Sequence, residues 1–306
     1  MINTHTDRPT LALAPCHRML KRYSVILTLT FFLAACAKSD NVPAFVEIEG
    51  ASLVTSTGQG GATIKATDAW VTLDEQLIGV WELPARIPVL GEGARTLGLE
   101  LAVKRNGAFD DRVRYPFYKP WQQTVDLRRE GTVEVNPQTS YVDDANIWFE
   151  GFEDPFSLFA NSASSDTQLI RFTPATHPEL LFLENGPCAG FRLDSDHPYA
   201  RVHTDVDFES FGGPCFLEID HRGDLQVVVG VQYFADGLER PEPYIYLPAT
   251  HRSDGTMPWS KVYVDLSGFF NSPVSERDLF IEALLPSGNA SAQVYFDNIK
   301  LLRIQP

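Results

Sequence analysis

The sequence predicts an all-β protein in which a small Ig-like β-sandwich is followed by a second, longer β-sandwich. Short stretches with alternating apolar and polar residues recur at roughly ten-residue spacing, which is typical of sandwich strands. Polar or Gly-rich turns separate these stretches, and no long helical pattern interrupts them. The chain changes character near Tyr141, so we expect one unit over residues 43–137 and another over residues 141–306.

The segment before these units has the features of an export signal. Lys21-Arg22 precedes an apolar run from Ser24 to Ala35 that is too short to cross a bilayer. The run ends in Leu-Ala-Ala followed by Cys36, which resembles the lipobox of bacterial lipoproteins. The resemblance implies a signal over residues 1–36, acylation of the Cys36 sulfur, and membrane lipid as a partner.

Three details of this signal follow from the neighbouring residues. Met19 stands just before the basic pair and is an alternative start of translation. Because Ala37 rather than Asp follows Cys36, the resemblance implies a lipid anchor in the outer membrane of a bacterial cell envelope. An ordinary signal peptide with a chance cysteine is the alternative. Residues 37–42 would form a short polar tether.

The first unit reads as a series of short strands. Ala69, Val71 and Leu73 alternate with polar neighbours, as in a half-buried strand, and Asp74-Glu75-Gln76 supplies a polar turn. Further strands are expected over 77–81, 97–103, 121–127 and 132–135, with turns at 91–93 and 106–107.

Part of the first unit resembles a PEGA-type domain, a small surface-layer β module. The resemblance rests on Asp68–Asp74, on Leu77-Ile78-Gly79 and on the later Gly-rich turn at 91–95. Glu75 stands where that family usually has glycine, and the family's proline after Gly79 is displaced to Pro84. The resemblance implies a structural or spacer module without catalytic residues.

The second unit opens with Trp148–Glu153, and its strands are expected over 190–194, 216–220, 225–233, 261–266, 279–285 and 293–302. Trp259–Ser267 and the closing Val294–Leu301 resemble strands of jelly-roll carbohydrate-binding modules of the galactose-binding-like type. The resemblance implies a jelly roll over 141–306. Because jelly rolls host lectins, hydrolases, lyases and spacers, it leaves the function open.

Strand alternation places a set of polar and aromatic residues on the face opposite the core. Aromatic rings stack on sugar rings, and carboxylates and amides bind hydroxyl groups, so this face is a candidate glycan site. The alternative is that it is the solvated side of an antiparallel sheet. The candidate ligand-binding residues on this face and in nearby loops are Glu218, Asp220, Gln232, Tyr233, Tyr244, Tyr246 and Tyr263.

Two cysteines follow Cys36, each in a Gly-Pro-Cys context. An even pair in an exported chain predicts one disulfide, Cys188–Cys215, with two buried free thiols as the alternative.

A structural calcium is implied by the jelly-roll resemblance. Glu150 or Glu153 with Asp297 matches in type and order the oxygen ligands that such modules use, although Asp297 could instead cap a turn or pair with Lys300. We expect no required cofactor, because the histidines lack zinc spacing and no phosphate-binding or hydrolase motif occurs.

The charge balance excludes some functions. The chain carries 25 Lys and Arg against 40 Asp and Glu, a formal charge of −15, which argues against nucleic acid as a partner. The favoured function is a non-catalytic module of the cell envelope that binds a glycan. The alternatives are a structural or assembly subunit that docks an envelope protein, and a weak glycoside hydrolase or lyase, since paired carboxylates also serve glycoside hydrolysis.

Overall fold

The computed structural model describes residues 42–304 apart from 211, 237 and 273–276. The expected signal and the lipidation site Cys36 therefore lie outside the described residues. Within the described residues, no helix is long and apolar enough to cross a membrane.

Residues 43–140 form β1 to β10, which pair in the orders β5-β1-β9, β10-β2 and β4-β3-β6-β7, with β8 also on β6. An apolar core that includes Val46, Val71 and Leu99 lies within this part. The strands are β1 (Ala44–Ile48), β2 (Ser52–Val54), β3 (Asp68–Leu73), β4 (Gln76–Glu82), β5 (Ala85–Val89), β6 (Gly93–Lys104), β7 (Arg112–Arg114), β8 (Trp121–Leu127), β9 (Thr132–Val135) and β10 (Gln138–Ser140).

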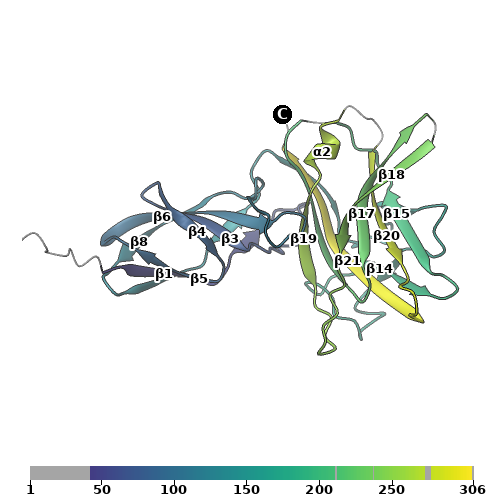
Figure 1. Ribbon diagram of the computed structural model, residues 1–306, viewed down its shortest axis with the longest axis horizontal. Coiled ribbons are helices and arrows are strands. Elements are labelled where there is room, and N and C mark those ends of the chain that lie inside the picture. Colours follow the sequence, from purple (N-terminus) through teal and green to yellow (C-terminus); the bar gives the residue numbers. More distant parts are fainter. Residues whose placement is uncertain (1–41, 211, 237, 273–276, 305–306) are drawn as a thin grey trace, which may run out of the picture. The chain divides into compact units, whose positions relative to one another are not determined.

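Residues 141–304 form two sheets that together make a jelly roll (Figure 1). The first sheet has the order β13-β14-β21-β16-β19, with β11 also on β21, and the second has the order β12-β15-β20-β17-β18. The elements are β11 (Ala145–Glu150), β12 (Phe159–Asn161), β13 (Ile170–Phe172), β14 (Cys188–Asp194), β15 (Tyr199–Thr204), β16 (Cys215–Gly223), β17 (Val227–Ala235), β18 (Leu238–Leu247), β19 (Ser260–Asp265), the short helix α2 (Ser267–Phe270), β20 (Arg277–Leu284) and β21 (Ser291–Ile304).

The predicted all-β fold class is confirmed, and strand alternation explains it. Val227, Val229 and Val231 of β17 are at most 1% exposed and face the core between the two sheets. The turn predicted at Asp74-Glu75 joins β3 to β4, and both residues have the positive φ that a tight hairpin requires (48° and 68°). The PEGA resemblance itself stays a prediction.

The predicted disulfide is wrong: Cys188 and Cys215 are free, buried thiols. Their strands lie on opposite sides of β21, where Ala189 pairs with Phe296 and Cys215 pairs with Arg303. From Phe296 to Arg303 the strand rises roughly 23 Å, whereas the Cα atoms of a disulfide lie within about 7 Å. Each Gly-Pro-Cys sequence therefore precedes or begins a separate strand, and the two cysteines are too far apart to bond.

The two parts of residues 43–306 belong to one compact unit and share an apolar core. Tyr115 and Phe117 of the first part pack against Phe216 of β16, with ring centroids 5.3 and 6.1 Å away. The hydroxyl groups of Tyr118 and Tyr263 share a hydrogen bond of 2.9 Å.

A buried polar network lies beside this shared core. Glu218, 0% exposed, accepts hydrogen bonds from Tyr115 (2.8 Å) and Tyr141 (2.9 Å), and its carboxylate lies 3.0 Å from the Lys261 amine. The same amine lies 3.2 Å from Asp220. Burial alone would lower the pKa of Lys261, but Asp220 and Glu218 outweigh burial and raise it. Lys261 is therefore a buried cation held by two carboxylates.

The network also binds the extended segment before β3. Thr63 donates to Asp220 at 2.6 Å, and Lys300 donates to the Gly61 carbonyl at 2.7 Å. Asn298 accepts from the Gly61 amide at 2.9 Å and donates to Asp220 at 3.0 Å. Because these donors come from both parts, the network fixes the first part against β16 and β21.

Replacing Lys261 should destabilise the protein strongly. In Lys261→Met, Glu218 and Asp220 lose their shared cation while they remain buried, so we expect a loss of about 3–5 kcal/mol in the free energy of unfolding, measured with urea. Arg128→Met removes an exposed pair with Asp126 and should cost less than about 1 kcal/mol. Equal losses in the two variants would contradict the network's role.

Candidate functional site

Three predicted ligand residues lie under the first part of the chain rather than in solvent. Glu218, Asp220 and Tyr263 are at most 2% exposed, and their polar atoms are engaged by Tyr115, Thr63 and Tyr118. Alternation assigned them to the non-core face of their sheet, but that face is covered. Their assignment to an open glycan surface is therefore wrong, although Asp220 and Tyr263 contribute to the wall of a pocket.

Gln232 lies on the outer face of the second sheet but is also buried. It accepts a hydrogen bond from Arg201 at 2.6 Å and donates one to Asp278 at 3.2 Å. The Arg201 guanidinium lies 4.4 Å from the centroid of the Phe280 ring. Gln232 is thus a member of a closed polar cluster, and its amide is not free to bind a ligand.

Tyr246 lies on β18 opposite Val228 and is 59% exposed. No hydrogen bond in the described part of the chain occupies its hydroxyl group, and it lines neither of the two pockets described below. Its exposed ring stands apart from the other predicted tyrosines.

Tyr233 and Tyr244 line one open groove of about 440 Å³, which is within the range of small-ligand sites. The Tyr244 ring packs edge-on against Phe269 of α2, with centroids 5.0 Å apart. The groove thus combines three aromatic rings, and the two predicted ones come from neighbouring strands β17 and β18.

Charged side chains complete this groove. Glu242 accepts a hydrogen bond from the Tyr233 hydroxyl at 2.7 Å. Asp265 accepts from the Ser267 amide and hydroxyl at 3.0 and 2.6 Å. Arg277 is 1% exposed and donates to Ser272, while its second terminal nitrogen has no partner within the described residues. Burial lowers the pKa of Arg277.

Asn106 supports the groove from the first part of the chain. Its side-chain amide donates to the Tyr244 hydroxyl at 3.1 Å, and its side-chain oxygen accepts from the Asp265 backbone amide at 2.8 Å. Sequence reasoning identified Asn106-Gly107 as a turn and missed this role. The positive φ of Asn106, 58°, fits the turn, but no local pattern indicates which strands the turn contacts.

The calcium ligands predicted from the sequence do not all fit a cation site. Both oxygens of Glu150 accept backbone hydrogen bonds, from Phe152 and Leu158 at 2.6 Å each, so Glu150 closes a loop instead. Burial raises the pKa of Asp297 to about 8, with Asp220 and Glu153 adding to the rise. Within the described ranges, no group of three or more acidic, His or Cys side chains is arranged to hold a metal. Calcium binding through Glu153 and Asp297 stays a prediction.

The sequence matches no protein-family model and no curated protein. Comparison with solved structures finds carbohydrate-binding modules. The Caldicellulosiruptor saccharolyticus module CBM27-1, solved with mannohexaose, is 14% identical, and the match covers 51% of this chain and 96% of that one at a TM-score of 0.35. The CBM22-1 xylan-binding domain of Paenibacillus barcinonensis Xyn10C is 9% identical, with 54% and 99% covered and a TM-score of 0.36.

A third similar structure is TmCBM61 in complex with β-1,4-galactotriose, 13% identical, with 51% of this chain and 95% of that chain covered at a TM-score of 0.31. At these low values, neither a ligand nor a binding position transfers to this chain, and the groove rests on its own geometry.

The buried carboxyl of Asp278 should make stability depend on pH. Burial raises the pKa of Asp278 to about 6, while in the unfolded chain this carboxyl has its ordinary pKa of 3.8. Between these values the folded state binds more protons, so this carboxyl makes stability fall as pH rises. In Asp278→Asn, the free energy of unfolding measured with urea should therefore decrease less between pH 4 and pH 6.5 than in the wild type. Asp126→Asn, at an exposed position, should leave this decrease unchanged, and an unaltered slope in Asp278→Asn would contradict the assignment.

Proposed function

We propose that this chain is a non-catalytic glycan-binding lipoprotein of the cell envelope, with the groove around Tyr233 and Tyr244 as its ligand site. The observation that carries the proposal is the combination of rings and charged groups in one open groove. Sugar rings present apolar C–H faces and a rim of hydroxyl groups, so they need both kinds of contact.

Each side chain of the groove has a distinct part in this proposal. The Tyr233 and Tyr244 rings provide stacking surfaces, and the Glu242 and Asp265 carboxylates accept hydrogen bonds from sugar hydroxyl groups. The Arg277 guanidinium, one nitrogen of which has no partner within the described residues, contributes a positive charge to the wall of the groove. Because Asn106 holds both the Tyr244 hydroxyl and the backbone of Asp265, the groove is preorganised before a ligand arrives.

The hydrogen bonding of the two carboxylates favours binding over hydrolysis. Glycoside hydrolysis needs one carboxyl that protonates the leaving group and a second that acts as base or nucleophile. Here Glu242 is engaged by Tyr233, and Asp265 is engaged by Ser267 and lies 3.5 Å from Arg105. Both carboxylates are therefore held as hydrogen-bond acceptors by neighbouring side chains, an arrangement that suits the recognition of hydroxyl groups.

The anchor and the first part complete the proposal. Acylated Cys36 would hold the protein in the membrane, and residues 43–140 would act as the spacer between lipid and jelly roll. A docking role on a protein partner is the second candidate, because Leu77 (59% exposed) and Val80 (47% exposed) lie on the edge strand β4.

Replacing the groove tyrosines should weaken glycan binding. An array of neutral and acidic oligosaccharides would first identify a binder, and titration calorimetry would then compare variants. Tyr244→Ala and Tyr233→Ala should each lower the affinity roughly tenfold, because a ring contact contributes about 0.5–1.5 kcal/mol beyond its buried area. Tyr233→Phe keeps the ring and should retain most of the affinity.

Tyr246→Ala is the matched control, because it removes an exposed tyrosine from the neighbouring position on β18 that lies outside the groove. An equal loss in Tyr246→Ala would place the glycan elsewhere. No binding across the array, together with co-purification of a stoichiometric protein partner, would replace the glycan proposal with the docking role.

The lipid anchor can be tested separately in cells. Cys36→Ser removes the acylated sulfur, so the variant should no longer incorporate a labelled fatty acid in cells, whereas the wild type should incorporate it. Cys188→Ser is the control, because Cys188 is buried in the jelly roll. Fatty-acid labelling of Cys36→Ser at the level of the wild type would show that the acylation site lies elsewhere.

A further inference from the structure

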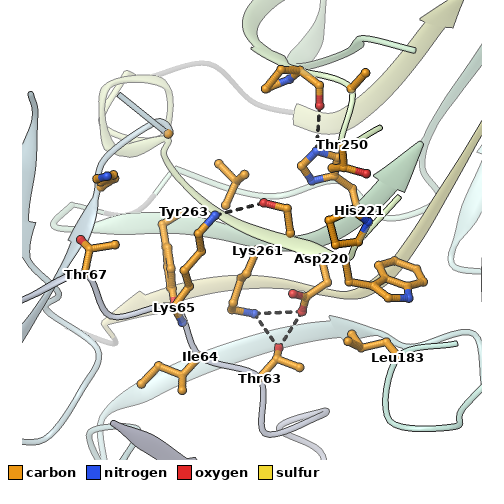
Figure 2. A pocket seen from close by; sticks show the side chains of 18 of the residues that line it. Thr63, Ile64, Lys65, Thr67, Leu183, Asp220, His221, Thr250, Lys261 and Tyr263 are labelled. Carbon is orange, nitrogen blue, oxygen red and sulfur yellow. Dashed lines mark hydrogen bonds and ion pairs between the residues drawn. The ribbon is translucent and has the colours of Figure 1, made fainter. Parts of the chain in front are cut away.

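A second and larger pocket, of about 770 Å³, lies where the segment before β3 meets the jelly roll (Figure 2). One wall is the Thr63–Thr67 segment, and the others are the beginning of β19 and the loop from Pro248 to Arg252. The pocket shares none of its lining residues with the tyrosine groove. It is a separate cavity with its own chemistry.

Two lysines in this pocket lack an acidic partner. The Lys65 amine donates to the Ser260 hydroxyl at 3.0 Å (Figure 2), and Asp220 is nearby without forming an ion pair with it. The Lys104 amine lies 5.0 Å from the Phe109 ring centroid. Neither forms an ion pair within the described residues. Burial lowers the pKa of Lys65, and the nearby charge of Lys104 lowers it further, against a smaller rise due to Asp220.

The contrast with Lys261 in the same pocket shows that these two charges are in excess. Lys261 lies within 3.2 Å of both Glu218 and Asp220 and is neutralised by them. The Lys65 and Lys104 charges remain on the wall, and Arg252 adds an exposed third at the rim. Lys65 and Lys104 repel each other, whereas Arg252 acts on Asp254, so an anion placed between the two lysines would relieve their repulsion.

The rest of the pocket suits a hydroxylated ring. His221 is 2% exposed, and its Nε2 lies 3.2 Å from the Pro248 carbonyl oxygen, which can only accept, so the ring proton is on Nε2. Its Nδ1 is then a buried acceptor near the Ser260 backbone, with no hydrogen-bond partner within the described part of the chain. The half-buried indole of Trp259, which donates to the Leu181 carbonyl at 2.8 Å, supplies an apolar surface.

We propose that this pocket binds a sugar that carries an oxyanion, with the carboxylate or phosphate group between Lys65 and Lys104 and the ring against Trp259. A hydroxyl group of the sugar donates to His221 Nδ1. The site is distinct from the glycan groove, so the chain has one aromatic site for a sugar and one cationic site for an acidic sugar.

Calorimetric titration of the full chain tests the proposal with four probes: glucuronate, glucose 6-phosphate, inorganic phosphate and glucose. At least one of the two sugar anions should bind, and glucose should not. Binding of glucuronate identifies a carboxylate as the anion, and binding of glucose 6-phosphate identifies a phosphate. The affinity should fall with added salt, since exposed charges are screened.

The variants locate the site. Lys65→Gln and Lys104→Gln should each lower the affinity about tenfold or more, and Tyr244→Ala should leave it unchanged because that residue lies in the other groove. Lys119→Gln is the matched control, because Lys119 pairs with Asp143 outside the pocket. Circular dichroism would verify that each variant is folded.

Three results would overturn the proposal. The first is a wild-type protein that binds neither sugar anion at millimolar concentration. The second is unchanged affinity in folded Lys65→Gln and Lys104→Gln. The third is inorganic phosphate binding as tightly as the sugar phosphate, which would remove the role of Trp259 and His221. If the wild-type protein binds glycans on the array but binds neither sugar anion, the proposal for the cationic pocket is overturned and the proposal for the tyrosine groove stands.

Discussion

The arrangement of the described residues from 43 to 304 depends on a buried cation, the Lys261 amine between Glu218 and Asp220. A buried charge is costly unless it is paired and hydrogen-bonded, and here tyrosine hydroxyl groups and Thr63 satisfy the remaining carboxylate oxygens. These donors come from segments far apart in the sequence. The polar network therefore requires the first part to sit in one register on β16, whereas an apolar contact alone would allow sliding.

Both pockets follow from this register. The segment that bonds Asp220 through Thr63 continues to Lys65, which forms a wall of the cationic pocket. The Asn106 turn reaches β19 through a hydrogen bond from its backbone amide to the Tyr263 carbonyl, at 2.8 Å, and thereby supports Tyr244. Each site thus depends on residues from both parts of the chain, and neither would be complete in an isolated jelly roll.

Local patterns in the sequence predicted the strands well and the partners of those strands poorly. Alternation correctly placed the valines of β17 in the core. Tyr233 and Tyr244, expected in loops, lie instead on strands β17 and β18 and line one groove. Alternation also placed Glu218 on a non-core face, but it cannot reveal that distant tyrosines cover that face. The disulfide prediction failed for the same reason, because β21, which follows both cysteines in the sequence, lies between their strands.

Under the proposed lipid anchor and glycan binding, the contact between Asn106 and Tyr244 would have a mechanical consequence. A pulling force between a bound ligand and the anchor passes through the junction of the two parts. Separation at that junction would draw Asn106 away from the Tyr244 hydroxyl and the Asp265 backbone, which releases one wall of the groove. The ligand would then dissociate before the hydrogen-bonded strands of either sandwich separate. Tension would therefore shorten the lifetime of the bound state without unfolding the protein.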